Sequence, residues 1–167
     1  MDYLQQNLNN LIYMMDSIIR RDVDCSIDSM LKSERLFVTG SELSVRVQEH
    51  FSEKANKIGM YTQVISKKEK VVRINDLDVL ICISKCGEER ELIKMAESFK
   101  EEGAYVISIT DRQSTLAKYS NRIINIDYKI ERKKTDYKSE MLFNQSVYIL
   151  LDSIVGSLSK RVPTTVI

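Results

Sequence analysis

Two short polar stretches have the residue types that bind anions, and each directly follows an apolar run. They read GSELS at 40–44 and SKCGEER at 84–90. Each has a glycine for a sharp turn, serine hydroxyls that can donate to a ligand, and a helical pattern immediately after it. The first backbone N–H groups of a helix attract phosphate, so both stretches are candidate phosphate loops. The candidate ligand-binding residues are Gly40, Ser41, Ser44, Ser84, Lys85, Cys86, Gly87 and Glu89.

The second stretch has acids where a phosphate loop should avoid them. A Glu89 carboxylate about 4 Å from a phosphate dianion would cost several kcal/mol at an effective dielectric constant of about 20. Either Lys85 or Arg90 offsets this repulsion, or Glu89 turns outward, or the ligand has no phosphate and is a neutral or amino sugar. Cys86 is a weak donor, so it weakens a phosphate site without closing it.

The elements that must position these loops alternate between strand and helix. Apolar runs predict strands, and most are continuous, as in strands covered on both faces of a parallel sheet. The predicted strands are 36–39, 61–65, 79–83, 105–109 and 122–126. Helical patterns over about 43–58 and 88–102 connect strands, and Gly59 and Gly103 fit left-handed helix ends. The connection over 111–121 has room for a single helical turn.

Long helices are predicted at both ends of the chain. Apolar residues recur at helical spacing over 4–19, and a shorter second helix is expected over about 24–32. The last helix has an apolar face over 143–158, and Pro163 marks its end. The charge-rich segment 129–140 is predicted to be a solvated loop.

This alternation predicts a three-layer α/β/α sandwich in one domain. We expect a five-stranded parallel sheet of flavodoxin-like order 2-1-3-4-5, with right-handed crossovers and helices on both faces. The domain covers 1–167, with leading helices over 1–33, an α/β core over 34–160 and a tail over 161–167. Ligands bind such sheets beyond the carboxyl ends of the strands, where the strand order reverses. Both candidate loops meet there, between the first and third strands.

The composition restricts the class of partner. Lys and Arg number 25 and Asp and Glu 24, a net charge of +1, so no overall field favours nucleic acid or an anionic membrane. No uncharged apolar run approaches the roughly 20 residues that span a bilayer, and the first residues do not have the pattern of a secretory signal. Three cysteines without paired spacing are typical of a cytoplasmic protein and predict no zinc site. No cofactor or metal is expected.

The two loops and the order of the elements resemble the sugar isomerase, or SIS, domain, whose loops read roughly G-x-G-x-S and S-x-S-G-x-T-x-E. The matching stretches are GSELS and SKCGEERE, followed by the similar stretch EEGAYVISITDRQSTLAKYSNRIINI. The resemblance covers nearly the whole chain and is closest to the sugar-phosphate-sensing domain of RpiR-type transcription regulators, then to standalone phosphosugar isomerases. It implies that loop hydroxyls and backbone N–H groups hold the phosphate of a phosphosugar.

The chain departs from the family pattern at three positions of these loops. Glu42 replaces the second glycine of the first loop, and Cys86 and Glu89 replace a serine and a threonine of the second. The last two departures touch phosphate binding most directly.

A further departure concerns catalysis. The resembled standalone isomerases have a glutamate near the start of the last helix, where this chain has Asn144, and an amide cannot act as a base. No catalytic residue is assigned. Glu140 and His50 are the remaining candidates for a base, and His50 is expected instead on a helix surface or at a partner contact.

These departures favour a sensor or regulator that binds a phosphosugar or amino sugar, RpiR-like and connected to transcription regulation and carbohydrate metabolism. Only about 34 residues precede the first strand, fewer than a helix-turn-helix domain needs, so this chain is not expected to bind nucleic acid directly. Two alternatives stay open: an aldose-ketose isomerase of phosphosugars, and a non-binding SIS-like dimeric scaffold. The apolar stripes of the first and last helices predict a homodimer. The resemblance implies that residues of the partner help to complete the ligand site.

Overall fold

The computed structural model describes residues 2–71, 73–128 and 137–163. Its centre is a five-stranded parallel sheet in the order β2-β1-β3-β4-β5, which confirms the predicted α/β fold and strand order. The strands are β1 (Arg35–Gly40), β2 (Thr62–Val64), β3 (Asp78–Ile83), β4 (Tyr105–Ile109) and β5 (Arg122–Ile124). β2 and β5 are shorter than predicted; both are edge strands, where only one neighbouring strand supplies hydrogen bonds.

The middle of the sheet is apolar on both faces. Along β3, Val79, Ile81 and Ile83 belong to one hydrophobic cluster, and Leu80 and Cys82 belong to another. Because successive side chains point to opposite faces of a strand, these clusters are two cores on opposite sides of the sheet. This double coverage is why the predicted strands read as continuous apolar runs.

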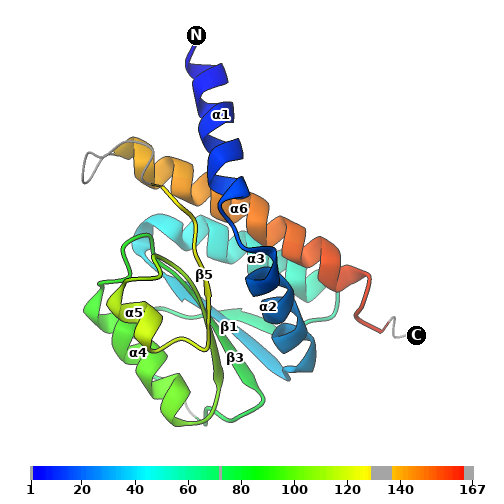
Figure 1. The fold of residues 1–167 in the computed structure, drawn as a ribbon. Helices are drawn as coiled ribbons and strands as arrows, with labels where there is room; N and C mark the ends of the chain where they lie inside the picture. Colours follow the sequence, from blue (N-terminus) through cyan, green and yellow to red (C-terminus); the bar gives the residue numbers. More distant parts are fainter. Residues whose placement is uncertain (1, 72, 129–136, 164–167) are drawn as a thin grey trace.

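Helices cover both faces (Figure 1). One face has α2 (Arg20–Lys32), α3 (Val45–Lys57) and α6 (Tyr137–Ser159), and the other has α4 (Arg90–Glu101) and the single turn α5 (Thr115–Lys118). Gly59 and Gly103, with φ of +92° and +85°, follow α3 and α4, which confirms the predicted left-handed helix ends.

The two predicted leading helices are both present, but the break between them lies earlier in the chain than predicted. α1 (Tyr3–Asp16) ends before a turn, and α2 begins at Arg20, earlier than predicted. Ser17 lies in the turn, where its hydroxyl donates to the Met14 carbonyl and accepts from the Asp127 N–H at 2.9 Å. The apolar spacing continues through the turn, so periodicity alone does not reveal where the first helix ends.

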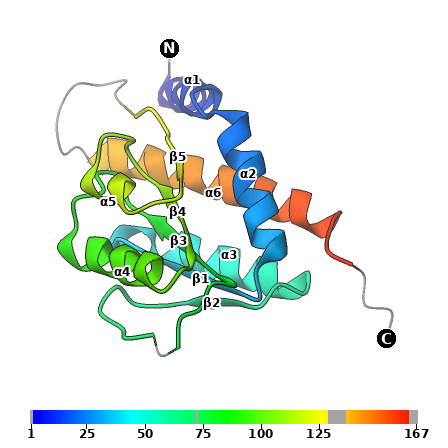
Figure 2. The ribbon, with the colours of Figure 1, turned by 60° about the horizontal axis from the view of Figure 1, so that its bottom comes forward.

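α1 extends away from the body of the domain in Figure 1, and in Figure 2 it lies at the top of the molecule, viewed nearly along its axis. Met14 is its buried residue. Its apolar side chains exposed to solvent are Tyr3, Leu4, Leu8, Ile12 and Tyr13. This helix therefore presents an apolar stripe that the described part of the chain leaves exposed.

α6 is the centre of one core. Its residues Phe143, Val147, Leu150, Leu151, Ile154 and Leu158 are buried. Within it, Lys138–Ser159 is long and apolar enough to cross a membrane, but 44% of its apolar stretch is buried and the helix packs against α1, α2 and α3. That is the packing of a core helix. α6 begins at Tyr137, so the predicted loop over 129–140 is wrong for its last four residues; 129–136 lies outside the described residues.

A buried carboxylate ties α2 to the far edge of the sheet. Asp22 accepts hydrogen bonds from Arg112 at 2.8 Å and from Arg122 at 3.1 Å. Hydrogen bonds with Tyr105 and then Asp22 raise the pKa of Arg122, which keeps its charge. One carboxylate thus joins α2, β5 and the connection between β4 and α5.

Candidate functional site

The first candidate loop closes tightly against the end of β3. At Gly40, the last residue of β1, a Cβ atom would lie 2.4 Å from the carbonyl oxygen of Ile83 and 2.7 Å from Ser44 Oγ. Side chains do not approach other atoms so closely, so this contact requires glycine. The Ser41 N–H donates to the same Ile83 carbonyl at 3.0 Å. The pairing of β1 with β3 therefore continues into the loop.

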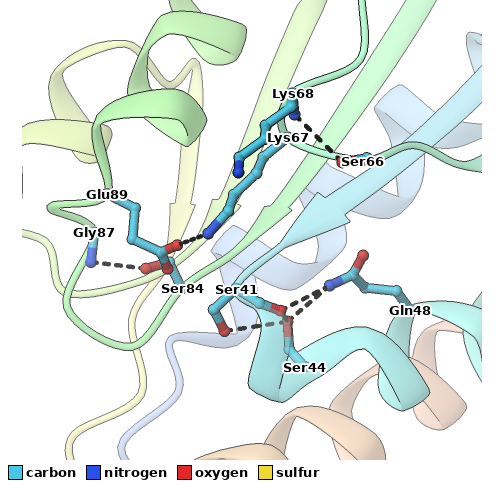
Figure 3. Close-up of polar contacts among 9 residues, drawn as sticks. All are labelled: Ser41, Ser44, Gln48, Ser66, Lys67, Lys68, Ser84, Gly87 and Glu89. Carbon is cyan, nitrogen blue, oxygen red and sulfur yellow. Dashed lines mark hydrogen bonds and ion pairs between the residues drawn. The ribbon is translucent and has the colours of Figure 1, made fainter.

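The serines of this loop bond to one another. Ser44, in the short 3-10 turn η1 (Glu42–Ser44), is fully buried; its Oγ donates to the Ser41 carbonyl at 2.9 Å and accepts from Gln48 Nε2 at 2.8 Å (Figure 3). A hydroxyl has one hydrogen, so in this arrangement Ser44 offers a ligand no donor. Its geometry is that of a residue that shapes the loop. Gln48 was not predicted to take part.

The second loop, 84–89, turns at Gly87. Ser84 is buried; its N–H donates to the Ile109 carbonyl at 3.1 Å, and its Oγ accepts from the Gly87 N–H at 3.0 Å. Gly87 has a φ of +66°, and a Cβ there would lie 2.4 Å from Ser114 Oγ and 2.5 Å from Thr110 Oγ1. Glycine is needed both for the backbone angle and for the space.

Glu88 strengthens the contact between this loop and α5. Its carboxylate accepts from the Thr115 N–H at 2.9 Å and from the Thr115 hydroxyl at 2.6 Å. These two hydrogen bonds lower the pKa of Glu88, and the bond from the Thr115 hydroxyl has the larger effect. In return, the Leu116 N–H donates to the Gly87 carbonyl at 3.0 Å. This acid therefore caps the neighbouring helix.

Glu89 has a different partner from the two that the sequence suggested. Its Oε2 pairs with Nζ of Lys67, in the loop after β2, at 2.5 Å (Figure 3). Lys85 is turned toward the start of α6, and Arg90 is exposed. The prediction missed Lys67, although a lysine just after the carboxyl end of a parallel strand lies at the ligand-binding edge of the sheet.

Lys85 joins the second loop to α6. Its Nζ donates to Ser139 Oγ at 2.8 Å, lies 3.4 Å from Glu140 Oε2, and stands 5.2 Å from the centroid of the Tyr128 ring. Cys86, the next residue, is exposed. Lys85, Glu88 and Glu89 thus contact three different neighbours: α6, α5 and the loop after β2.

A cavity of about 1040 Å³ lies beside the two loops. It is lined by α1, by the start of α3, by the second loop and by the first turns of α6. Its polar lining includes Arg46, Lys85, Cys86 and Glu140. Pockets for small ligands usually measure roughly 300–1,000 Å³, so this one has room for a sugar phosphate.

Asn144, which stands where the resemblance implies a glutamate, also lines this cavity. Its Nδ2 donates to the Leu43 carbonyl at 3.1 Å. Asn144 therefore ties α6 to the first loop. Glu140, one helical turn earlier, lies against Lys85 at the same cavity.

His50 lies at the contact between α3 and α6. Its Nε2 is 2.8 Å from Asp152 Oδ1, and its ring packs on Tyr148 with centroids 4.6 Å apart. Its side chain is 26% exposed. It belongs to a helix-helix contact, and only its neighbour Tyr148 reaches the cavity lining.

The cysteines differ in access. Cys82 is buried in β3, as predicted, and burial raises its pKa. Cys86 is exposed and Cys25 is half-buried. Within the described part of the chain, no three His, Cys, Asp or Glu side chains lie close enough to hold a metal ion.

Comparisons with known proteins agree with this architecture. The chain is 24% identical to an uncharacterized protein of Archaeoglobus fulgidus, over 95% of this chain and 87% of the relative. The sugar isomerase domain of an RpiR transcription factor from Sphaerobacter thermophilus has the same fold, with a TM-score of 0.78 and 14% identity over 96% of this chain and 89% of that one. Vibrio vulnificus NanR, complexed with ManNAc-6P, has a TM-score of 0.77 and 17% identity over 95% of this chain and 61% of NanR. Residues 29–149 match the SIS domain, and the chain belongs to the SIS domain family.

Proposed function

We propose that this chain binds a carbohydrate derivative, a phosphosugar or an amino sugar, and acts as a sensor or regulator. The observation that carries the proposal is the meeting of the two glycine loops where the strand order reverses, made possible by the absence of a side chain at Gly40. Ligands bind parallel sheets at this point, and the start of α4 adds N–H donors for an anionic group.

The neighbouring cavity supports a ligand of sugar size. Its volume of about 1040 Å³ accommodates a monosaccharide phosphate, and its lining includes Arg46 and Lys85 beside Glu140. NanR, which has the same fold, was solved with ManNAc-6P. We infer a ligand of that class, with its phosphate near Gly87 and its sugar toward the cavity.

Asn144 supports the sensor over the enzyme. An isomerase needs a base within reach of the substrate carbon, and an amide cannot accept that proton. The Asn144 amide is instead engaged with the Leu43 carbonyl. Binding without turnover suits a regulator, and the RpiR transcription factor is a fold neighbour.

A phosphosugar isomerase is the second candidate. Glu140 and Lys85 lie 3.4 Å apart at the cavity, a carboxylate and an ammonium group with the chemistry of a base and an acid. If turnover occurs, these two side chains carry it. His50 is less suited, because Asp152 and Tyr148 engage it away from the loops.

We also infer that the chain forms a cytoplasmic homodimer through the exposed stripe of α1. Leu4 and Leu8 are 69% and 45% exposed and line the cavity, so a second copy that covers them would also close the ligand site. Direct binding of nucleic acid is not part of this proposal.

The test is a thermal-shift panel of sugar phosphates, each paired with its unphosphorylated sugar, beginning with ManNAc-6P and ManNAc. A ligand at a hundred times its Kd adds about 2.7 kcal/mol, which raises Tm by about 5–11 °C for a domain of this size. The same samples are assayed for aldose-ketose interconversion, which a sensor should lack. A complete panel without a shift contradicts ligand binding, and turnover that disappears in Glu140→Gln selects the isomerase.

A further inference from the structure

Lys67 reaches the site from a segment outside both candidate loops. Its Nζ pairs with Glu89 Oε2 at 2.5 Å, as Figure 3 shows. Glu89 immediately precedes α4, but its carboxylate makes no capping hydrogen bond within that helix. The lysine, rather than the helix start, therefore holds this carboxylate.

The ammonium group of Lys67 contacts the Glu89 carboxylate and also feels the charges of other acids of the two loops. Its pKa is raised first by the hydrogen bond to Glu89 and further by the charges of Glu89, Glu42 and Glu91, while partial burial acts in the opposite direction. Glu42 belongs to the first loop and Glu91 to the first turn of α4. The side chain of Lys67 is only 15% exposed. A charged, partly buried ammonium group therefore lies against the second loop, where it can bind an anion strongly.

We propose that Lys67 binds the phosphate of the ligand, and that Glu89 takes the place of this phosphate on Lys67 in the ligand-free protein. The inference rests on the proposed function and deepens it, because it names the residue that selects phosphorylated sugars. On binding, Nζ exchanges a carboxylate oxygen of Glu89 for a phosphate oxygen, and no covalent bond changes. Phosphate has the advantage of more charge, since a phosphate monoester carries about −1.5 to −2 at pH 7 against −1 for the carboxylate.

The internal pair also sets the ligand concentration at which the site fills. Every binding event must separate Lys67 from Glu89, so the affinity is lower than an unpaired lysine would give. An acid at position 89, where the family pattern has a threonine, thus weakens the site without abolishing it. Such a site responds to a high concentration of ligand and stays empty at a low one.

The test is a titration of inorganic phosphate into 15N-labelled protein at constant ionic strength, followed by the Gly87 amide signal. Glu89→Gln is expected to bind phosphate about tenfold more tightly than wild type, because it releases Lys67 and preserves the side-chain shape. Lys67→Met is expected to bind about tenfold less tightly. In the Lys67→Met background, Glu89→Gln should bring no more than about a twofold gain, because the lysine that it releases is absent.

Matched controls remove the same charges one residue away. Glu88→Gln and Lys68→Met should both bind phosphate as wild type does, since Glu88 faces α5 and Lys68 is exposed. Equal affinity in wild type and Lys67→Met, or an equal gain from Glu89→Gln with and without Lys67, would overturn this inference and leave the proposed function standing. If neither phosphate nor any sugar of the panel, phosphorylated or not, binds to any of these proteins, both fall.

Discussion

Gly87→Ala is the substitution whose effect can best be worked out from the structure. The backbone at Gly87 has a φ of +66°, which costs an alanine about 1–2 kcal/mol. The added Cβ would also meet Ser114 Oγ at 2.4 Å and Thr110 Oγ1 at 2.5 Å, and such overpacking costs about 1–3 kcal/mol more. We therefore expect the free energy of unfolding to fall by about 2–5 kcal/mol.

Gly59→Ala is the matched control. Gly59 also has a positive φ, +92°, but the nearest atom to an added Cβ is 3.8 Å away, in Val162. This variant has the backbone cost without the clash, about 1–2 kcal/mol. Urea unfolding of wild type and the two variants gives the difference directly. Gly87→Ala should also lower the affinity for phosphate, because the turn that presents the loop N–H groups must shift.

A second-site change identifies the clash. Ser114→Gly removes both Ser114 atoms that crowd the new methyl group, and glycine is nearly as good as serine at the start of a helix, within a few tenths of a kcal/mol. Combined with Gly87→Ala it should restore about half of the clash term, since Thr110 remains. Equal destabilisation of Gly87→Ala and Gly59→Ala, to within about 0.5 kcal/mol, would refute the reasoning, because the loop would then not be packed rigidly against its neighbour.

Three other regions give separate predictions. Asp22→Ala should lower the free energy of unfolding in urea by about 2–4 kcal/mol, because it leaves two arginines without their shared carboxylate; a loss below about 0.5 kcal/mol would contradict this. The lowered pKa of Glu88 means that its contact with Thr115 stabilises the fold above the ordinary glutamate pKa and is lost as pH falls through the folded value. Glu88→Gln should therefore lose less stability than wild type between about pH 5 and pH 3, and equal slopes in acid titrations would count against the contact. In native protein, Ellman's reagent should modify Cys86 rapidly and Cys82 only on unfolding. The Cys86 thiol is exposed, whereas the Cys82 thiol is buried and its pKa is raised. Rapid modification of both would show that β3 opens readily.

The strands could be predicted because their apolar runs are local, and their order because it is a common one for a five-stranded doubly wound sheet. β3 is covered on both faces, so its sequence is apolar without interruption. The glycines after α3 and α4 adopt a positive φ, which ends a helix whatever the rest of the fold. The position of the break between α1 and α2 could not be predicted in the same way. It depends on a hydrogen bond from the Asp127 N–H to Ser17 Oγ, between residues far apart in the sequence.

The two loops could be found from their residue types, but their internal contacts could not. Lys85 and Arg90 are the nearest cations to Glu89 in sequence, yet consecutive side chains of a tight turn point in different directions. Glu89 meets Lys67 because β2 and β3 are parallel and their carboxyl ends lie on the same side of the sheet, with β1 between them. The strand order predicts that Lys67 and Glu89 lie in the same region. It does not predict that these two side chains are partners.

The extension of the sheet into the loops bears on how quickly the site can respond. The Ser41 N–H bonds to the Ile83 carbonyl and the Ser84 N–H to the Ile109 carbonyl, so both loops begin as continuations of the hydrogen-bonded ladder. Such loops are already ordered. Ligand binding therefore needs little further ordering of the backbone, and little affinity is lost to that entropy cost. Association can then approach the usual rate at which small molecules encounter a protein. The site would fill soon after the ligand concentration rises, because no loop has to fold first. A change of shape would have to begin in a side chain, and Lys85, which bonds the second loop to the first turn of α6, is placed to carry that change to the longest helix of the domain.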